Sequence, residues 1–522
     1  MWTRASFALL LLMACDPPNT EGLIDDVACP SDSRCPDASG AFRVGAARRV
    51  ITPVVESWDD EDGDGVRDPG EAFDDVDGDG RWDPVWIAGF DPGRAATGVH
   101  DDTWARALSI SRGETRLGIV VLDLLGVSHD DVVDLRMAAQ ARGLDVDHVA
   151  VVATHTHESQ DPLGFGGAHL IASGYDRAYN ERVIAQALDA LAEAIDAERE
   201  ATMTFARTAA PHLVADSRLP EVIDATITAL RFDSAEGPIA TVVIWGNHAE
   251  ALGGENTLVS SDYPHYLRRE LEAAYPGAVA FYMPGALGGL MNPMDIAGCP
   301  DEAGRETCAT GTFEKAEYVG AGAATIAIEA LESAPTTVVE PALAFRANPF
   351  LLRVTTPEIL GAVQLGVIPR RLFRTDGTRV TLDEEPTAPA LPWDEVLLGD
   401  VRIQTEVNVW TIGPLRFLAL PGELYPELWL QHPDGTSLAE SRPGADYPFL
   451  APPPSFQSLL PEDGTTSVLI NQANDAVGYI VPRSQWDRLP PHTYGDDPQY
   501  GEGVSLGSHV AGALREAVRE MR

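Results

Sequence analysis

Short apolar runs of strand length alternate along the chain with longer segments that repeat apolar residues every three to four positions. The short runs are typical of buried strands, and the longer segments are typical of helices that pack against a sheet. We expect strands at 117–122, 148–153, 239–245, 279–283, 415–420 and 467–470. We expect helices at 130–142, 177–197, 263–274, 314–333 and 509–521. This alternation predicts an α/β fold with a mixed sheet flanked by helices.

The domain organisation follows from composition. No strong change in composition divides residues 46–522, so we expect a single large domain there. The Pro-rich stretches 384–393 and 448–455 are typical of loops. With 80 acidic against 37 basic residues, the formal net charge is −43. Such a chain repels phosphate backbones, so nucleic-acid binding is not expected, and no obligate protein partner is evident.

The N-terminus indicates export. Arg4 precedes a short apolar run that is typical of a secretory signal in residues 1–14. Residues 12–15 resemble a bacterial lipobox, which implies cleavage before Cys15 and a lipid anchor on that cysteine. The expected location is therefore outside the cytoplasm, on a bacterial membrane at the periplasm or cell surface. The alternative is an ordinary signal peptide. Residues 15–45, rich in Pro, Asp and Ser, are expected to form a tether.

Four further cysteines are expected to be structural. Cys29, Cys35, Cys299 and Cys308 allow three pairings, and the two local pairs each close a small loop. Their spacing does not fit a zinc knuckle, and no histidine accompanies either pair.

An acidic insert at 58–91 carries two loops of the EF-hand type. The first fits D-x-D-x-D-G with an acid at its twelfth position, and the second repeats the first nine positions but has Trp86 where the last acid belongs. The expected calcium ligands are Asp60, Asp62, Asp64, Asp68 and Glu71 in the first loop and Asp75, Asp77, Asp79 and Asp83 in the second. No amphipathic helix pair flanks the loops, so we expect structural calcium rather than a switch. The alternative is a solvated acidic loop.

Side chains that bind metals follow several of the apolar runs. His155 and His157 come after the run 148–153, and an extended chain points both to the same side. His248 follows the run 239–245, Glu423 follows 415–420, and Tyr479 follows 467–470. Sites in α/β folds lie at the C-terminal ends of strands, and two imidazoles with a carboxylate are a common catalytic zinc set. The sequence therefore predicts a metal site at these strand ends.

The same segments resemble a family, the neutral/alkaline (non-lysosomal) ceramidases, which are zinc amidases. The resemblance rests on T-H-T-H at 154–157, Asn247-His248 with the segment 256–262, and P-G-E at 421–423. Further similar stretches lie at 45–52, 98–108, 121–125 and 478–479. The resemblance covers about residues 46–522 and concerns the family's catalytic domain. The long members of the family add a C-terminal β-sandwich, for which we expect no room in this chain.

The resemblance implies roles for single residues. It implies a zinc ion bound by His155, His248, Glu423 and Tyr479. His157 would face the scissile carbonyl, and Arg218 would be a substrate-site arginine. Tyr500 would be a second tyrosine of the site, with Tyr494 as a competing choice. The implied activity is hydrolysis of an amide, in ceramide or another N-acyl lipid or amide, by metal-activated water.

Two departures from the family concern the surroundings of the site. Glu158 follows T-H-T-H where the family usually has serine, and it could be a general base or cap a turn. Met291 stands near the position of a family serine. The substrate surroundings have therefore changed, and an ester is a competing substrate class.

Two other functions compete with the hydrolase. One is a non-catalytic, calcium-stabilised surface lipoprotein that binds glycans or partners. The other is a metal-dependent phosphoesterase, which would use Asp123 and Asp262 as additional ligands.

Overall fold

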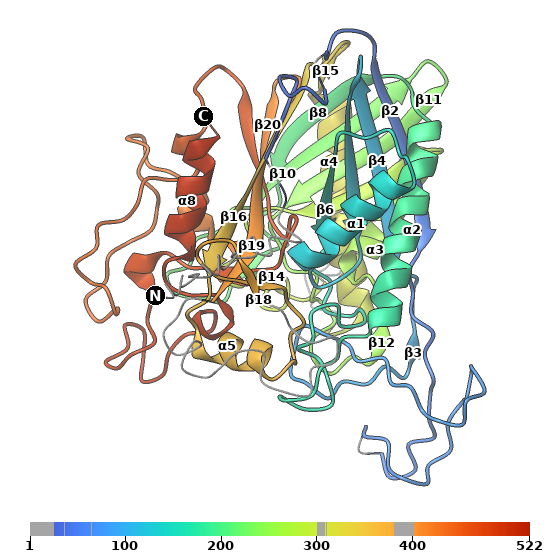
Figure 1. The fold of residues 1–522 in the computed structure, drawn as a ribbon, viewed down its shortest axis with the longest axis vertical. Helices are drawn as coiled ribbons and strands as arrows, with labels where there is room; N and C mark the ends of the chain where they lie inside the picture. Colours follow the sequence, from blue (N-terminus) through green and yellow to red (C-terminus); the bar gives the residue numbers. More distant parts are fainter. Residues whose placement is uncertain are drawn as a thin grey trace, which may run out of the picture.

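The computed structural model of the chain describes residues 24, 26–35, 37–63, 65–299, 308–309, 311–380 and 401–521 (Figure 1). Three larger sheets dominate the described residues. The first sheet has the order β6 (His148–Ala153), β5 (Thr115–Leu122), β4 (Trp104–Arg112), β2 (Phe42–Val50) and β7 (Arg199–Glu200). The second has the order β13 (Val279–Pro284), β11 (Gly237–Trp245), β10 (Thr226–Ser234), β8 (Thr202–Ala209) and β15 (Thr336–Val338).

The third sheet contains seven strands. Its main order is β1 (Val27–Cys29), β16 (Leu343–Arg353), β19 (Arg402–Ile412), β17 (Leu372–Phe373) and β18 (Arg379–Val380). β20 (Leu415–Ala419) pairs with the C-terminal half of β19, on the edge that also carries β17, and β22 (Thr466–Ile470) pairs with β20. Each of the three sheets contains one parallel pair, β5–β6, β11–β13 and β20–β22, among antiparallel neighbours.

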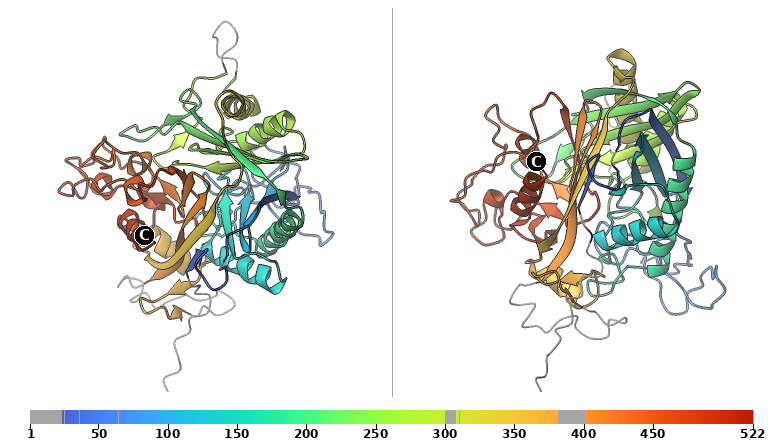
Figure 2. Two further views of the ribbon diagram at one scale, coloured as in Figure 1. Left: turned by 90° about the horizontal axis from the view of Figure 1, so that it is seen from above. Right: turned by 45° about the horizontal axis from the view of Figure 1, so that its top comes forward.

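The three sheets enclose one shared core, with helices on the outside (Figure 2). Inner-face side chains from all three sheets, among them Ile119, Phe232 and Trp410, belong to one buried cluster. The first sheet is covered by α1 (His129–Ala141) and α2 (Arg177–Asp196), the second by α3 (Tyr263–Ala274) and α4 (Phe313–Ser333), and the third by α5 (Pro357–Gln364), α7 (Pro426–Trp429) and α8 (Val510–Glu520). Each sheet is therefore apolar on both faces, which explains the near-continuous apolar runs in the sequence.

Several helices begin at a residue whose side chain accepts a hydrogen bond from a free backbone amide of the first turn. Ser128 Oγ accepts from Asp131 N at the start of α1, Asp176 accepts from Ala178 N at the start of α2, and Thr312 accepts from Lys315 N at the start of α4. Such contacts satisfy donors that have no partner inside the helix.

The predicted α/β fold with a single large domain is confirmed, and every strand and helix expected from the sequence is present. The arrangement differs from a single mixed sheet, because three sheets share the core. The tether expected at 15–45 also needs correction. β1 pairs with β16, and β2 already begins at Phe42, so the folded part starts before residue 46.

Both local cysteine pairs form disulfides, Cys29–Cys35 and Cys299–Cys308. Residues 1–14 and Cys15 lie outside the described residues, as does the Pro-rich loop expected at 384–393. Within the described part of the chain, no helix combines the length and apolar character needed to cross a membrane.

Candidate metal centre and active site

The segments that follow the parallel strands of the three sheets meet at one end of the molecule. His155 follows β6 of the first sheet, His248 follows β11 of the second, and Glu423 follows β20 of the third. Backbone contacts join these segments: Thr156 and Ala249 form a parallel bridge. In the same way Glu423 pairs with Tyr479 through the short parallel sheet β21 (Glu423–Leu424) and β23 (Tyr479–Ile480). The four residues implied as zinc ligands are thus brought together by backbone pairing.

His155 and His248 are held by backbone carbonyls. His155 Nδ1 lies 2.5 Å from Leu125 O, and His248 Nδ1 lies 2.7 Å from Met291 O. A proton on Nδ1 satisfies each carbonyl and leaves the Nε2 lone pair free for a metal. His155 adopts a left-handed backbone with φ of 64°, which is uncommon for residues other than glycine and is often found at functional sites.

Both Nε2 atoms face the same carboxylate. Glu423 Oε2 lies 3.6 Å from His155 Nε2 and 3.1 Å from His248 Nε2. Burial lowers the pKa of His248, which favours the neutral imidazole that binds metals. Burial alone would raise the pKa of Glu423, but the neighbouring His155 and His248 hold it well below its ordinary value.

These distances fit a bound metal. Zinc bonds of about 2.0–2.1 Å at tetrahedral angles place two ligand atoms roughly 3.3 Å apart. The two histidine-to-Glu423 distances lie close to this value, and so does the 3.3 Å between Tyr479 Oη and His248 Nε2. His155, His248, Glu423 and Tyr479 are all buried, which suits a ligand group that is kept from bulk water.

His157 belongs to the same group of side chains. His155, His157 and His248 offer ligand atoms within 4.8 Å of one another, and His157 Nε2 lies 3.4 Å from His155 Nε2. The sequence assigned His157 to the substrate rather than to the metal. The structure places its ring at the cavity wall, directly beside the ligand group. Burial lowers the pKa of His157 well below its ordinary value, and the neighbouring His155 adds to this.

A cavity of about 310 Å³ opens next to the histidines. His155, His157, Glu423 and Tyr479 belong to its lining. Most of the remaining lining is apolar, from Leu163, Phe165, Leu170, Val354, Ile359, Val363, Ile368, Ile403, Val477, Val504 and Leu506. The cavity therefore combines a mainly apolar lining with the polar side chains of the candidate metal centre.

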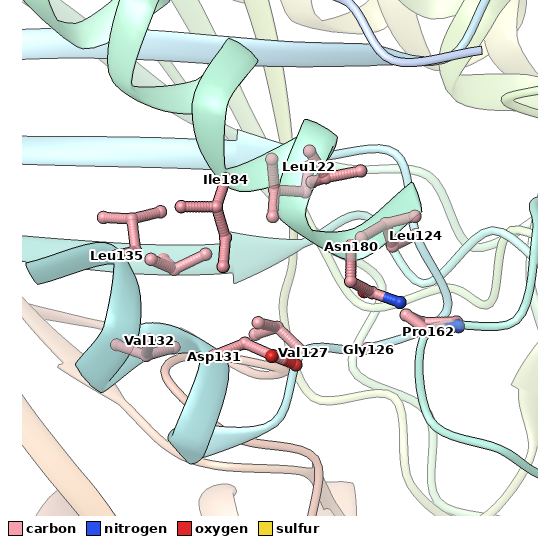
Figure 3. Close-up of a pocket in the computed structure, with 12 residues that line it drawn as sticks. Leu122, Leu124, Gly126, Val127, Asp131, Val132, Leu135, Pro162, Asn180 and Ile184 are labelled. Carbon is pink, nitrogen blue, oxygen red and sulfur yellow. The ribbon is translucent and has the colours of Figure 1, made fainter. Parts of the chain in front are cut away.

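Figure 3 shows a different and much smaller space, between α1, α2 and the first sheet. It measures about 10 Å³ and is lined mostly by aliphatic side chains, with Asp131 and Asn180 as polar members. A space of this size holds at most about one water molecule, so it is a packing gap rather than a ligand site.

Of the two predicted substrate-site residues Arg218 and Tyr500, only Tyr500 lines the cavity. Tyr500 lines the cavity, with its ring 5.6 Å from that of Tyr479. Arg218 does not line the cavity, because its guanidinium forms a buried two-bond pair with Glu502 at 2.7 and 3.0 Å. Arg218 also donates to the backbone oxygen of Tyr500 at 2.5 Å. The predicted contact of Arg218 with substrate therefore stays a prediction, and in the structure Arg218 contacts the backbone of the lining residue Tyr500. The competing Tyr494 is not part of the lining.

The two positions at which the sequence departs from the ceramidase pattern have structural explanations. Glu158 is fully buried and accepts from Asn256 Nδ2 at 2.8 Å, with Arg94 3.4 Å away. It does not line the cavity, so it stabilises the loop after β6. Met291 contributes its backbone oxygen, which accepts from His248 and leaves its side chain in the core.

The aspartates that a phosphoesterase would need are used elsewhere. Asp123 forms a buried two-bond pair with Arg268 at 2.6 and 2.9 Å. Asp262 accepts from the backbone amide of Tyr263 at the start of α3 and from that of Leu252. Neither belongs to a described group of potential metal ligands.

The acidic insert brings several expected calcium ligands together. Groups with ligand atoms within 4.8 Å of one another are formed by Asp60, Asp62 and Glu71, by Asp77, Asp79 and Asp83, and by Glu56, Asp75 and Asp77. Asp68 belongs to none of these groups, and Asp64 lies outside the described residues.

Glu56 was missed by the sequence analysis because it precedes both loops and lies outside their repeat. Its carboxylate accepts from the amides of Val76 at 3.0 Å and Asp83 at 2.8 Å. It therefore supplies the buried acid that the second loop lacks at Trp86.

The comparisons with known proteins concern the fold. No protein-family model matches the chain, and no curated protein matches it. The solved structure of neutral ceramidase from Pseudomonas aeruginosa matches with a TM-score of 0.63 and 16% identity, over 92% of this chain and 74% of that one. A structure described as ceramidase complexed with C2 matches with a TM-score of 0.63 and 15% identity, over 92% and 75%. The chain therefore has a neutral ceramidase-like fold.

Proposed function

We propose that the protein is a zinc-dependent hydrolase that cleaves the amide bond of an N-acyl lipid such as ceramide. The observation that carries the proposal is the meeting of His155, His248 and Glu423 beside a mainly apolar cavity, which His155 and Glu423 help to line. A zinc ion held there would supply a Lewis acid and lower the pKa of a bound water. The neutral ceramidase-like fold supports the same reaction class.

The substrate class follows from the cavity. Its apolar side walls suit a hydrocarbon chain, because burying each methylene contributes about 0.8 kcal/mol. We expect the carbonyl to lie near His157 and Tyr479, which line the same cavity. Tyr500 lies at the same wall and is about half exposed, at 55%, so its hydroxyl is available to a head group.

The same observation supports an enzyme over a non-catalytic lipoprotein. A surface lipoprotein stabilised by calcium needs only the acidic insert. Burying histidines and a glutamate lowers the stability of the fold, and such buried groups are typical of functional sites. We also propose that the insert binds structural calcium, and that the chain is anchored outside the cytoplasm through a lipid on Cys15. The two disulfides support an oxidising compartment.

The test uses the full chain, purified in detergent and loaded with zinc. Ceramide, N-acyl amides with other head groups, and matching esters are offered, and released fatty acid is measured. We expect amide hydrolysis that a zinc chelator abolishes and added zinc restores. His432→Ala, which changes an exposed histidine, is the control for His155→Ala. A zinc-loaded protein that releases no fatty acid from any of these substrates would refute the proposal.

A further inference from the structure

Two segments beside the cavity expose large apolar side chains to solvent. In residues 162–173, which follow T-H-T-H, Leu170 is 81% exposed, Ile171 is 70% exposed and Phe165 is 41% exposed. In residues 359–369, which include the end of α5, Leu365 is 58% exposed. Exposed apolar side chains that gather beside a cavity are typical of a surface that binds a partner.

The two segments lie against each other. Ser173 Oγ donates to the backbone oxygen of Val367 at 2.7 Å. Gly164, with φ of 103°, lies so close to the same oxygen that a Cβ atom would overlap it. Both segments also line the cavity, through Phe165 and Leu170 in the first and Ile359, Val363 and Ile368 in the second. Residues 162–173 and 359–369, called the rim below, therefore form one apolar surface that continues into the cavity.

The rim differs from the rest of the chain in charge. It contains no Asp, Glu, Lys or Arg, although 22% of all residues are charged, a share that would place about five charged residues in the two segments. Protein partners usually surround an apolar contact with polar and charged residues, and a net charge of −43 repels an anionic surface. The rim therefore matches a lipid bilayer whose head groups carry no net charge.

We propose that the rim docks on such a bilayer and delivers a lipid from it to the cavity. Phe165 and Leu170 are both exposed and part of the cavity lining, so a lipid that moves along them keeps its hydrocarbon chain away from water. Asp91, an exposed acid that also lines the cavity, disfavours an anionic bilayer further. The delivery of an N-acyl lipid rests on the proposed function, whereas the docking itself does not.

The first test measures co-sedimentation with phosphatidylcholine vesicles. It uses residues 16–522, which contain every described residue but neither the expected signal nor Cys15, so that no apolar signal or attached lipid can bind. We expect binding at low and high salt, with zinc or with a chelator, because an apolar contact is not screened by salt. Absence of binding, or tighter binding to phosphatidylglycerol vesicles that salt weakens, would overturn the proposal.

The second test changes the rim. Ile171→Ser with Leu365→Ser removes two exposed side chains that do not line the cavity, and we expect it to weaken vesicle binding by about 10-fold. The matched control is Met137→Ser with Val339→Ser, which changes exposed apolar residues in α1 and directly after β15. β15 and α5 lie at opposite ends of the molecule (Figure 1). We expect the control to bind like the wild type, and equal losses in both double variants would overturn the proposal.

A second copy of the chain is the competing occupant of the rim. Sedimentation velocity at increasing protein concentration distinguishes the two, and we expect a monomer throughout. A dimer that the wild type forms and the Ile171→Ser, Leu365→Ser variant does not form would overturn docking on a bilayer.

The last test connects docking to the proposed reaction. Hydrolysis is measured on ceramide in phosphatidylcholine vesicles and on a short-chain N-acyl amide dissolved as monomers. We expect the Ile171→Ser, Leu365→Ser variant to lower the ratio of the first rate to the second by about 10-fold, and the control to leave it unchanged. An unchanged ratio in the rim variant would overturn the delivery of substrate. A wild type inactive on both substrates would refute the proposed function, and vesicle binding would then decide the docking surface alone.

Discussion

At the residue scale, the sequence predicted the members of the site better than their partners. His155, His248 and Glu423 could be found because each follows an apolar run that ends at the site. Glu250 and Glu502 could not, because the residues that they face are distant in sequence. Glu250 faces His157 across the bridge between two loops, and Glu502 pairs with an arginine 284 positions away.

The buried pair of Arg218 and Glu502 gives a prediction on stability. Both side chains are almost completely buried, at 4% and 2% exposed. Glu502→Ala leaves the guanidinium without its partner, so we expect the free energy of unfolding to fall by about 3–5 kcal/mol. Urea denaturation measures this change.

The control for this prediction is the double variant Arg218→Met with Glu502→Leu, which removes both charges. We expect it to recover most of the loss, because apolar residues of similar size can replace a buried pair. Equal destabilisation in the single and double variants would show that packing, rather than the unpaired charge, sets the cost.

At the element scale, the strands that the sequence predicts are those with continuous apolar runs. β4 and β19 were missed because they contain buried polar residues that interrupt the pattern. Ser109 and Ser111 of β4 donate to Glu198, and Glu406 of β19 pairs with Arg136 of α1. Such residues are tolerated in a core because partners from other elements satisfy them, which a single segment of sequence does not reveal.

The acidic insert is the element whose stability we expect to depend on bound calcium. We expect calcium to protect residues 58–83 from limited proteolysis, and a chelator to expose them, because the exposed carboxylates repel one another without the ion. At a calcium concentration 100-fold above Kd, binding adds about 2.7 kcal/mol to the stability of the bound form. Fragment masses after proteolysis identify the cleaved segment.

Two variants separate a calcium site from a solvated acidic loop. Asp62→Asn removes a member of one acidic group and is expected to abolish the protection by calcium. Asp59→Asn, an exposed acid outside the groups, is expected to leave it intact. Identical cleavage with calcium and with chelator in the wild type would contradict the calcium site.

At the scale of the whole molecule, the sequence predicted the fold class but not the number of sheets. Three sheets bury their inner faces in one core, and nothing in a single apolar run says which neighbours it will face. Contacts between a covering helix and a neighbouring sheet are carried partly by charges. Arg136 on α1, outside the first sheet, donates two bonds of 2.8 Å to Glu406 in the third sheet.

The pair of Arg136 and Glu406 predicts that the stability of the folded state depends on pH. Burial alone would raise the pKa of Glu406, but Arg136 lowers it from 4.5 to about 2. A carboxyl group with a lowered pKa stabilises the folded state above its unfolded pKa. We therefore expect about 3 kcal/mol to be lost as the pH falls from 4.5 to about 2.

Urea denaturation at several pH values measures this loss. Glu406→Gln is expected to be less stable at neutral pH and to lack this part of the acid dependence. The control is Glu236→Gln, which changes an exposed glutamate. Parallel pH curves for wild type and Glu406→Gln would contradict the assignment.

The proposed anchor belongs to the same scale. In a bacterial host we expect the wild-type chain in the membrane fraction, because lipid chains on Cys15 partition into the bilayer. Cys15→Ser is expected to move the protein to the soluble extracytoplasmic fraction. Fractionation followed by mass analysis of the N-terminal peptide checks both the location and the lipid. A wild-type chain in the soluble fraction, without lipid, would indicate an ordinary signal peptide.

The central claim is that His155, His248 and Glu423 hold one catalytic zinc ion. Metal content measures it most directly, after the wild type, His248→Ala and the exposed control His432→Ala are dialysed with calcium present. We predict about one zinc per chain in the wild type and control and none in His248→Ala, with the fold and bound calcium retained in all three. Absence of zinc from the wild type, or equal zinc in His248→Ala, would contradict the proposed metal centre.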